Sequence, residues 1–234
     1  SDWGATHSSE ALELGLDMEL PDAVYFKDEA LSKMDRNFVQ LAVRRVLASI
    51  YHLRLEEQPQ CEMPCRERQS NQRTSAHVKL AREAATAGVV LLKNDGLLPL
   101  DSGSVKTLAI VGEAAQAKDK LNTWGPGSPY SGGGSGHVGS PFVVTPAQGI
   151  RDAAEERGIK VLEYPDKYMA FQNMEKADVV IVVGAASATE SKDRKTLELE
   201  DDADELILTA AGLRPTVALL EVPGVVLTPW RNAV

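Results

Sequence analysis

The sequence predicts an α/β fold built on a mostly parallel sheet, and three observations support this prediction. Residues 179–183 (VVIVV) form an unbroken β-branched run, which is typical of a strand buried on both faces. From Leu108 onward, apolar runs of strand length alternate with helical patterns, as they do when helices cover both faces of a parallel sheet. The length of 234 residues and the apolar content of 43% suit one large or two modest folded domains.

In the N-terminal part of the chain, the residue pattern predicts mainly helices. A short helix is expected over 6–14, followed by a strand over 16–20, where the residues alternate in polarity. Residues 27–55 predict helix because, in their second part, apolar side chains recur every three or four positions. Residues 56–75 are polar, charged and interrupted by prolines, which indicates a linker or an excursion between domains.

The remaining elements are expected from the same periodicities. Helices are predicted over 76–87, 146–157, 168–176 and 201–211, with a short helix or turn over 113–121. Strands are predicted over 89–95, 108–112, 161–164, 179–183 and 216–221. In such a sheet the carboxyl ends of the parallel strands share one edge, and open α/β sheets bind their ligands at that edge.

Charge and residue spacing exclude several classes of partner. The net charge of −9 and the pI near 5.0 argue against nucleic acid or an anionic membrane, because both require a basic surface. No apolar run approaches the roughly 20 residues that span a bilayer. His7, His52, His77 and His137 show no paired ligand spacing, so neither a metal nor a cofactor is expected.

Cys61 and Cys65 are separated by the residues EMP. This spacing favours a small disulfide in an oxidising compartment, and the alternative is two free thiols. Because no histidine pair lies nearby, the two cysteines do not complete a structural zinc site.

The stretch 124–140 (WGPGSPYSGGGSGHVGS) follows the strand at 108–112 and is rich in glycine and serine. It lacks the G-x-x-x-x-G-K-[ST] pattern, and no helix begins directly after its glycines, so a phosphate-binding loop is disfavoured. Two interpretations stay open. The stretch is a flexible surface loop, or Gly132–Ser135 lets the backbone pass close to another domain or a ligand.

Glu190 follows the buried strand at 179–183 and a loop of small residues. Its position places a carboxylate at the carboxyl edge of the predicted sheet, which makes it a candidate catalytic acid. The ordinary alternative is a solvated loop carboxylate, since most glutamates are exposed.

Several sequence motifs, taken together and in order, resemble those of family 3 glycoside hydrolases, the β-glucosidase and β-xylosidase group. The most specific are the opening S-D-W and the stretch LLKN-x-G-x-LPL within 80–100. The others are GLDMELP at 15–21, RRVLASIYHLRL at 44–55, GGGSGHV at 132–138, TPAQGI at 145–150, the strand and loop ending in ESKDR, and Pro229-Trp230. The chain departs from the family pattern at Arg54, where glycine is common, and at 198–206, which lacks the usual Pro-Gly.

The resemblance implies a domain organisation. Residues 1–55 would be the last elements of a (β/α)8-like barrel, residues 56–104 a linker carrying a helix and a strand, and residues 105–234 most of an α/β sandwich domain. By the same comparison, the chain is expected to be truncated at both ends.

The resemblance also implies a catalytic pair. Asp2 matches the family's nucleophile and Glu190 its general acid/base, with Glu198 a poor second. In retaining enzymes the two carboxyl groups lie about 5–5.5 Å apart, so docking of two domains would have to bring Asp2 and Glu190 together. Glu190 would then need a raised pKa to hold its proton. Arg194 is accordingly expected to face elsewhere or to bind Asp193.

Two further residues are placed by the same resemblance. Trp3 would form a stacking wall for a sugar ring, and its ordinary alternative is packing. Asp17 is expected to be structural.

The implied function is that of a retaining exo-acting β-glycosidase of the β-glucosidase type, acting on a β-linked oligosaccharide or glycoside. Because the barrel residues that grip the sugar are missing, this fragment is expected to be nearly inactive alone. The alternative is a non-catalytic carbohydrate-binding or interaction module on a flavodoxin-like sheet. The family suggests an extracellular or periplasmic location, and the sequence names neither the sugar nor the oligomeric state.

Overall fold

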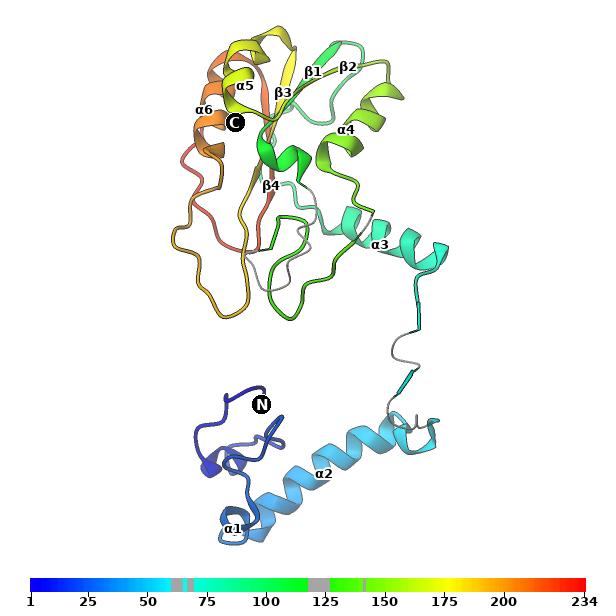
Figure 1. The fold of residues 1–234 in the computed structure, drawn as a ribbon, viewed down its shortest axis with the longest axis vertical. Coiled ribbons are helices and arrows are strands. Elements are labelled where there is room, and N and C mark those ends of the chain that lie inside the picture. Colours follow the sequence, from blue (N-terminus) through cyan, green and yellow to red (C-terminus); the bar gives the residue numbers. More distant parts are fainter. Residues whose placement is uncertain (60–64, 67–69, 118–126, 141) are drawn as a thin grey trace. The chain divides into compact units, whose positions relative to one another are not determined.

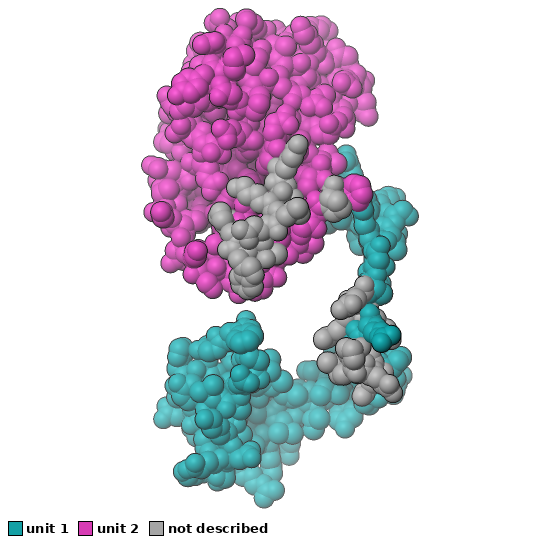
Figure 2. Space-filling view, viewed as in Figure 1, with its two compact units in different colours: residues 1–89 teal, residues 90–234 magenta. Residues whose placement is uncertain are grey.

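A computed structural model describes the chain except for residues 60–64, 67–69, 118–126 and 141. The described residues form two compact units, Ser1–Val89 and Val90–Val234, which Figure 2 shows in different colours. In the described part of the chain, no helix has both the length and the apolar character needed to cross a membrane.

The first unit contains helices where the periodicities predicted them, except that the helix expected over 27–55 is interrupted at 32–35. Among its described residues are the 3-10 helix η1 (Ser9–Leu12), α1 (Asp28–Leu31), α2 (Arg36–His52), the 3-10 helix η2 (Leu55–Glu57) and α3 (Ser75–Gly88) (Figure 1). Side-chain caps fix where the two long helices begin. The carboxylate of Asp35 accepts from the backbone N–H of Asn37, and the hydroxyl of Thr74 accepts from that of His77.

The strand predicted over 16–20 is wrong. Its polar residues Asp17 and Glu19 bond to other parts of the first unit, and no partner strand lies beside them among the described residues. Asp17 forms an ion pair with Arg45 of α2, with 2.5 Å between Nη2 and Oδ1. Glu19 accepts hydrogen bonds from the backbone N–H groups of Tyr25 and Phe26, at 2.9 and 2.8 Å. Asp17 is therefore structural, as expected.

The second unit is an α/β fold around a four-stranded parallel sheet, which confirms the predicted fold class. The strands are β1 (Thr107–Val111), β2 (Lys160–Tyr164), β3 (Val179–Ala185) and β4 (Thr216–Glu221), in the order β2-β1-β3-β4 (Figure 1). From β1 the chain moves to one side to form β2 and then crosses to the other side for β3. The carboxyl ends of β1 and β3 therefore flank a topological switch point, where such sheets bind ligands.

Both faces of the sheet are covered, because alternate residues of the strands pack into separate clusters. Val180 and Val182 of β3 pack with residues of α5 (Lys167–Asn173) and α6 (Ala203–Leu213). Val179, Ile181 and Val183 pack on the opposite side with residues of α4 (Pro146–Glu155). Every residue of β3 is buried, as its unbroken apolar run predicted.

The strand predicted over 89–95 is also wrong. No strand forms there among the described residues, and the apolar side chains from Val89 to Leu92 are exposed, with Leu92 at 84%. Lys93 instead forms an ion pair with Asp95, with 2.7 Å between Nζ and Oδ2, and donates to the carbonyl oxygen of Val234. High β propensity alone does not make a strand without a neighbouring strand to bond.

Several sequence predictions fall partly on residues that are not described, among them the linker over 56–75 and the helix or turn over 113–121. Cys61 lies outside the described residues, whereas Cys65 is disulfide-bonded. The first residues of the glycine-rich stretch, up to 126, also lie outside them.

Candidate active site

Glu190 lies in the loop that follows β3, at the carboxyl edge of the sheet. The glycine-rich loop runs beside it, and both loops extend from the same edge in Figure 1. Gly133 pairs with Thr189 in a parallel bridge, and its N–H donates to the carbonyl oxygen of Ala188 at 3.0 Å. In return, the N–H of Glu190 donates to the carbonyl oxygen of Gly133 at 3.4 Å. The sequence predicted both loops but not their pairing.

Ser135 of the glycine-rich loop binds the Glu190 carboxylate through two donors. Its backbone N–H lies 2.6 Å from Glu190 Oε2, and its hydroxyl lies 2.5 Å from the same oxygen. The hydroxyl, followed by the N–H, holds the pKa of Glu190 below its ordinary value, because both bonds favour the ionised form. The proposed acid role required a raised pKa for Glu190. In the second unit by itself this pKa is lowered, so that expectation is wrong there.

Gly134 explains why this loop needs glycine. Its φ is +92°, and a Cβ built on it would lie 2.4 Å from the Cβ of Glu190 and 2.8 Å from Oε2. Any side chain there would displace Glu190. The backbone of the glycine-rich loop thus passes close to Glu190 of the same unit, a contact that neither sequence interpretation named, and the predicted approach to another domain or a ligand stays a prediction.

Arg194 points to the C-terminal segment. Its Nη2 donates to the carbonyl oxygen of Val225, in keeping with the prediction that it faces elsewhere than Glu190. Nearby, the N–H of Leu227 donates to the carbonyl oxygen of Leu197 at 2.8 Å. These bonds tie the C-terminal segment to the loop that carries Glu190. The second-choice acid, Glu198, is exposed in this loop.

Asp2 and Trp3 lie in the first unit, in the turn that opens the chain. Both are exposed, and Trp3 shows 78% of its surface. The carbonyl oxygen of Asp2 accepts from the N–H of Ala5 at 2.8 Å, which closes the turn. The N-terminal amino group of Ser1 donates to the carbonyl oxygen of Met18 at 2.7 Å. The structure therefore places the predicted nucleophile on one unit and the predicted acid/base on the other.

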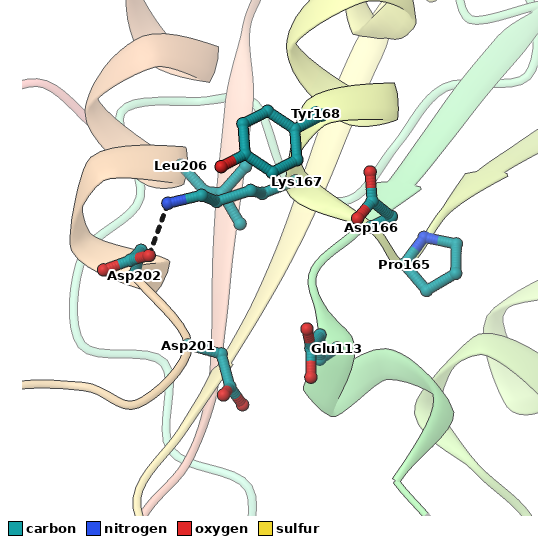
Figure 3. Close-up of a pocket in the computed structure, with 8 residues that line it drawn as sticks. All are labelled: Glu113, Pro165, Asp166, Lys167, Tyr168, Asp201, Asp202 and Leu206. Carbon is teal, nitrogen blue, oxygen red and sulfur yellow. Dashed lines mark hydrogen bonds and ion pairs between the residues drawn. The ribbon is translucent and has the colours of Figure 1, made fainter.

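A pocket of about 200 Å³ lies elsewhere along the carboxyl edge, between the end of β1 and the beginnings of α5 and α6. Figure 3 shows its lining: Glu113, Pro165, Asp166, Lys167, Tyr168, Asp201, Asp202 and Leu206. Lys167 Nζ lies 2.5 Å from Asp202 Oδ2, and this bond raises the pKa of Lys167. None of the predicted site residues lines this pocket.

Comparison with known proteins identifies the family. Residues 89–234 match the model of the glycosyl hydrolase family 3 C-terminal domain. The chain belongs to glycoside hydrolase family 3. The matched residues include the sheet, the glycine-rich loop and Glu190, whereas Asp2 and Trp3 precede them.

Individual relatives agree with the family assignment. The exo-α-(1→6)-L-arabinopyranosidase of Bifidobacterium longum is 30% identical over 100% of this chain and 32% of its own length. The β-glucosidase of Rhizobium radiobacter is 30% identical over 65% of this chain and 18% of its own length. The family 3 chain thus spans about a third of the length of the arabinopyranosidase that it matches.

Solved structures show the same fold. The β-D-glucoside glucohydrolase of Trichoderma reesei matches with a TM-score of 0.70 at 22% identity, over 99% of this chain and 36% of that one. A family 3 β-glucosidase of Bifidobacterium adolescentis matches with a TM-score of 0.64 at 23% identity, over 99% of this chain and 34% of that one.

Glu221 is a carboxyl group that the sequence interpretation of this family 3 chain missed. It is the last residue of β4 and pairs in register with Ala185, so it lies at the same edge as the loop of Glu190. Burial raises the pKa of Glu221, in the direction opposite to that of Glu190. Its position at the end of the predicted strand over 216–221 is the sequence feature that could have identified it. Because it lies at the same sheet edge, Glu221 is a suitable control residue for Glu190.

Proposed function

We propose that this chain carries the catalytic pair of a retaining exo-acting β-glycosidase, with Asp2 as nucleophile and Glu190 as general acid/base. The observation that carries the proposal is the position of Glu190. It lies within the residues matched to the family, at the carboxyl edge of the sheet, and a dedicated loop holds its carboxylate. Asp2 is supported by its S-D-W motif and its exposed carboxylate.

In the first step of the proposed reaction, the Asp2 carboxylate forms a bond to the anomeric carbon. The bond from that carbon to the glycosidic oxygen breaks, and the oxygen takes the proton of Glu190. In the second step, Glu190 takes a proton from water as the water oxygen bonds to the anomeric carbon and Asp2 leaves. The two inversions retain the configuration, and the net reaction is hydrolysis.

The lowered pKa of Glu190 favours the second step, in which it acts as a base. The first step needs the protonated form of Glu190. The proposal therefore requires that the pKa of Glu190 rise when a sugar binds. Burial under a bound sugar and the negative charge of a nearby nucleophile both act in that direction. We therefore propose that substrate binding, not the second unit alone, prepares Glu190 to donate its proton.

The proposal extends to the chain alone, which should turn over glycosides very slowly. Asp2 and Trp3 are exposed, so a sugar at Asp2 would be neither enclosed nor oriented by the described residues around it. Orientation of the substrate supplies a large share of enzymatic rate enhancement. The relatives of this chain include a β-glucosidase and an exo-α-(1→6)-L-arabinopyranosidase, so the substrate is proposed to be a terminal glycoside of this kind.

The test grafts this chain into the B. longum arabinopyranosidase, in place of the third that it matches along its whole length. The chimera, the chain alone and their variants are incubated with p-nitrophenyl β-glucoside, β-xyloside and α-L-arabinopyranoside. Asp2→Asn should abolish turnover by the chimera. Glu190→Gln should slow it by roughly two to four powers of ten, the usual contribution of a general acid/base.

Glu221→Gln is the matched control, because it removes a carboxyl group from the same sheet edge. It should leave turnover within a few-fold of the parent chimera. An active chimera that tolerates Asp2→Asn, or that loses more activity from Glu221→Gln than from Glu190→Gln, contradicts the assignment. A folded chimera that binds glycosides without hydrolysing them would support the binding-module alternative.

A further inference from the structure

We propose that Ser135 is a positioning residue for Glu190. By holding Oε2, it makes Oε1 the oxygen that carries the proton to and from the glycosidic oxygen. This inference rests on the proposed role of Glu190 as general acid/base, and it adds a residue from the glycine-rich loop to the reaction.

The geometry of the donors supports this assignment. Two donors of one residue, an N–H at 2.6 Å and an O–H at 2.5 Å, converge on a single carboxylate oxygen. A backbone N–H only donates, so Oε2 can keep that bond only through a lone pair. No hydrogen bond to Oε1 is found among the described residues. A protonated carboxyl oxygen is a weaker acceptor than an unprotonated one, so both bonds from Ser135 are best kept when the proton lies on Oε1.

The glycine-rich loop is organised to present Ser135 in this way. The bridge between Gly133 and Thr189 fixes the register of the two loops immediately before Ser135 and Glu190. Gly134, with its positive φ, lets the backbone turn over the Glu190 side chain at a distance that no Cβ would permit. The N–H of His137 donates to the carbonyl oxygen of Gly134 at 3.1 Å and closes the turn that follows.

Ser135 itself is exposed, so its hydroxyl is not required to fill a core. Its contacts favour the ionised carboxylate, which helps Glu190 to act as a base and opposes its action as an acid. Removing the hydroxyl should therefore raise the pKa of Glu190 while leaving the backbone N–H bond in place. A serine that held Glu190 only through its backbone N–H would leave this titration unchanged when its hydroxyl is removed.

The experiment measures the titration of Glu190 in the complete 234-residue chain by ¹³C NMR of glutamate carboxyl carbons. Glu190→Gln assigns the signal, because that signal alone disappears. Ser135→Ala should move its midpoint to higher pH, and Ser135→Thr, which keeps a hydroxyl, should leave it near that of the wild type. Ser131→Ala is the matched control, since it removes another hydroxyl from the same loop. The hydroxyl oxygen of Ser131 accepts a hydrogen bond from the N–H of Val138.

An unchanged midpoint in a folded Ser135→Ala chain, as judged by its amide spectrum, overturns the proposal. So does an equal shift in Ser131→Ala. If Ser135→Ala does not fold, Ser135→Thr decides whether the hydroxyl acts on Glu190. Threonine keeps the hydroxyl, so a Glu190 midpoint far from the wild-type value would contradict that role. The titration needs no turnover, so its result is independent of whether Asp2 and Glu190 hydrolyse a glycoside. Failure of the chimera would remove the catalytic role and leave the contact intact.

Discussion

Gly134 offers the sharpest test of how the site is built. Gly134→Ala places a methyl group where the structure leaves 2.4 Å to the Cβ of Glu190. Gly136 lies two positions further along the same loop and has nothing within 4 Å of an added Cβ, with no positive φ. The two substitutions add the same atoms to the same loop, so they form a matched pair.

The expected magnitudes differ because only one glycine is constrained. An alanine at φ +92° carries a backbone strain of about 1–3 kcal/mol, and relief of the clash must also move Glu190. Gly134→Ala should therefore lower the free energy of unfolding by at least about 1–3 kcal/mol. Gly136→Ala should stay within about 0.5 kcal/mol of the wild type, as surface substitutions usually do.

The assay is urea unfolding followed by circular dichroism, with the Glu190 titration recorded for each folded variant. Gly134→Ala should also move the Glu190 midpoint to higher pH, because displacement of Glu190 weakens both bonds from Ser135. Equal stability of the two variants, together with an unchanged Glu190 midpoint, would refute the close approach of the loops.

Two further predictions concern residues that stabilise the second unit around the site. Trp230 is buried and its indole N–H lies 2.6 Å from Asp204 Oδ1, so Trp230→Ala should lower the free energy of unfolding by about 3–5 kcal/mol. Trp230→Phe should cost less, about 1.5–3 kcal/mol in the same urea titration, since a ring remains but the hydrogen bond to the Asp204 carboxylate is lost. The backbone N–H groups of Lys106 and Thr107 hold the pKa of Asp178 below its ordinary value. Its stabilising contribution is thus present above the ordinary aspartate pKa and is lost as the pH falls, and Asp178→Asn should remove this part of the pH dependence of the urea midpoint.

The sequence predicted the sheet well because its strands carry local signals. The run at 179–183 has no polar face, so it fits only a doubly covered strand, and β3 is buried throughout. The segments 16–20 and 89–95 carry β-like patterns without a neighbouring strand, and neither forms one. Strand formation depends on a partner, and a local pattern does not reveal whether one exists.

The site was predictable only in its separate parts. Glu190 and the glycine-rich loop were each recognised, but 55 residues separate Ser135 from Glu190, and no local pattern encodes their contact. The predicted direction of the shift in the Glu190 pKa was wrong for the same reason, because the two donors that lower this pKa come from that distant loop. Family resemblance supplied the pairing of Asp2 with Glu190, and this pairing stays a prediction.

The central claim, that Asp2 attacks the sugar and Glu190 assists, is tested most directly by trapping the covalent intermediate. The chimera is treated with a 2,4-dinitrophenyl 2-deoxy-2-fluoro-glycoside of the sugar that it hydrolyses best, and its peptides are analysed by mass spectrometry. We expect a fluoroglycosyl adduct on the peptide that contains Asp2, formed rapidly and absent from Asp2→Asn. An active chimera that carries its adduct on another residue, or that forms none, would contradict this claim.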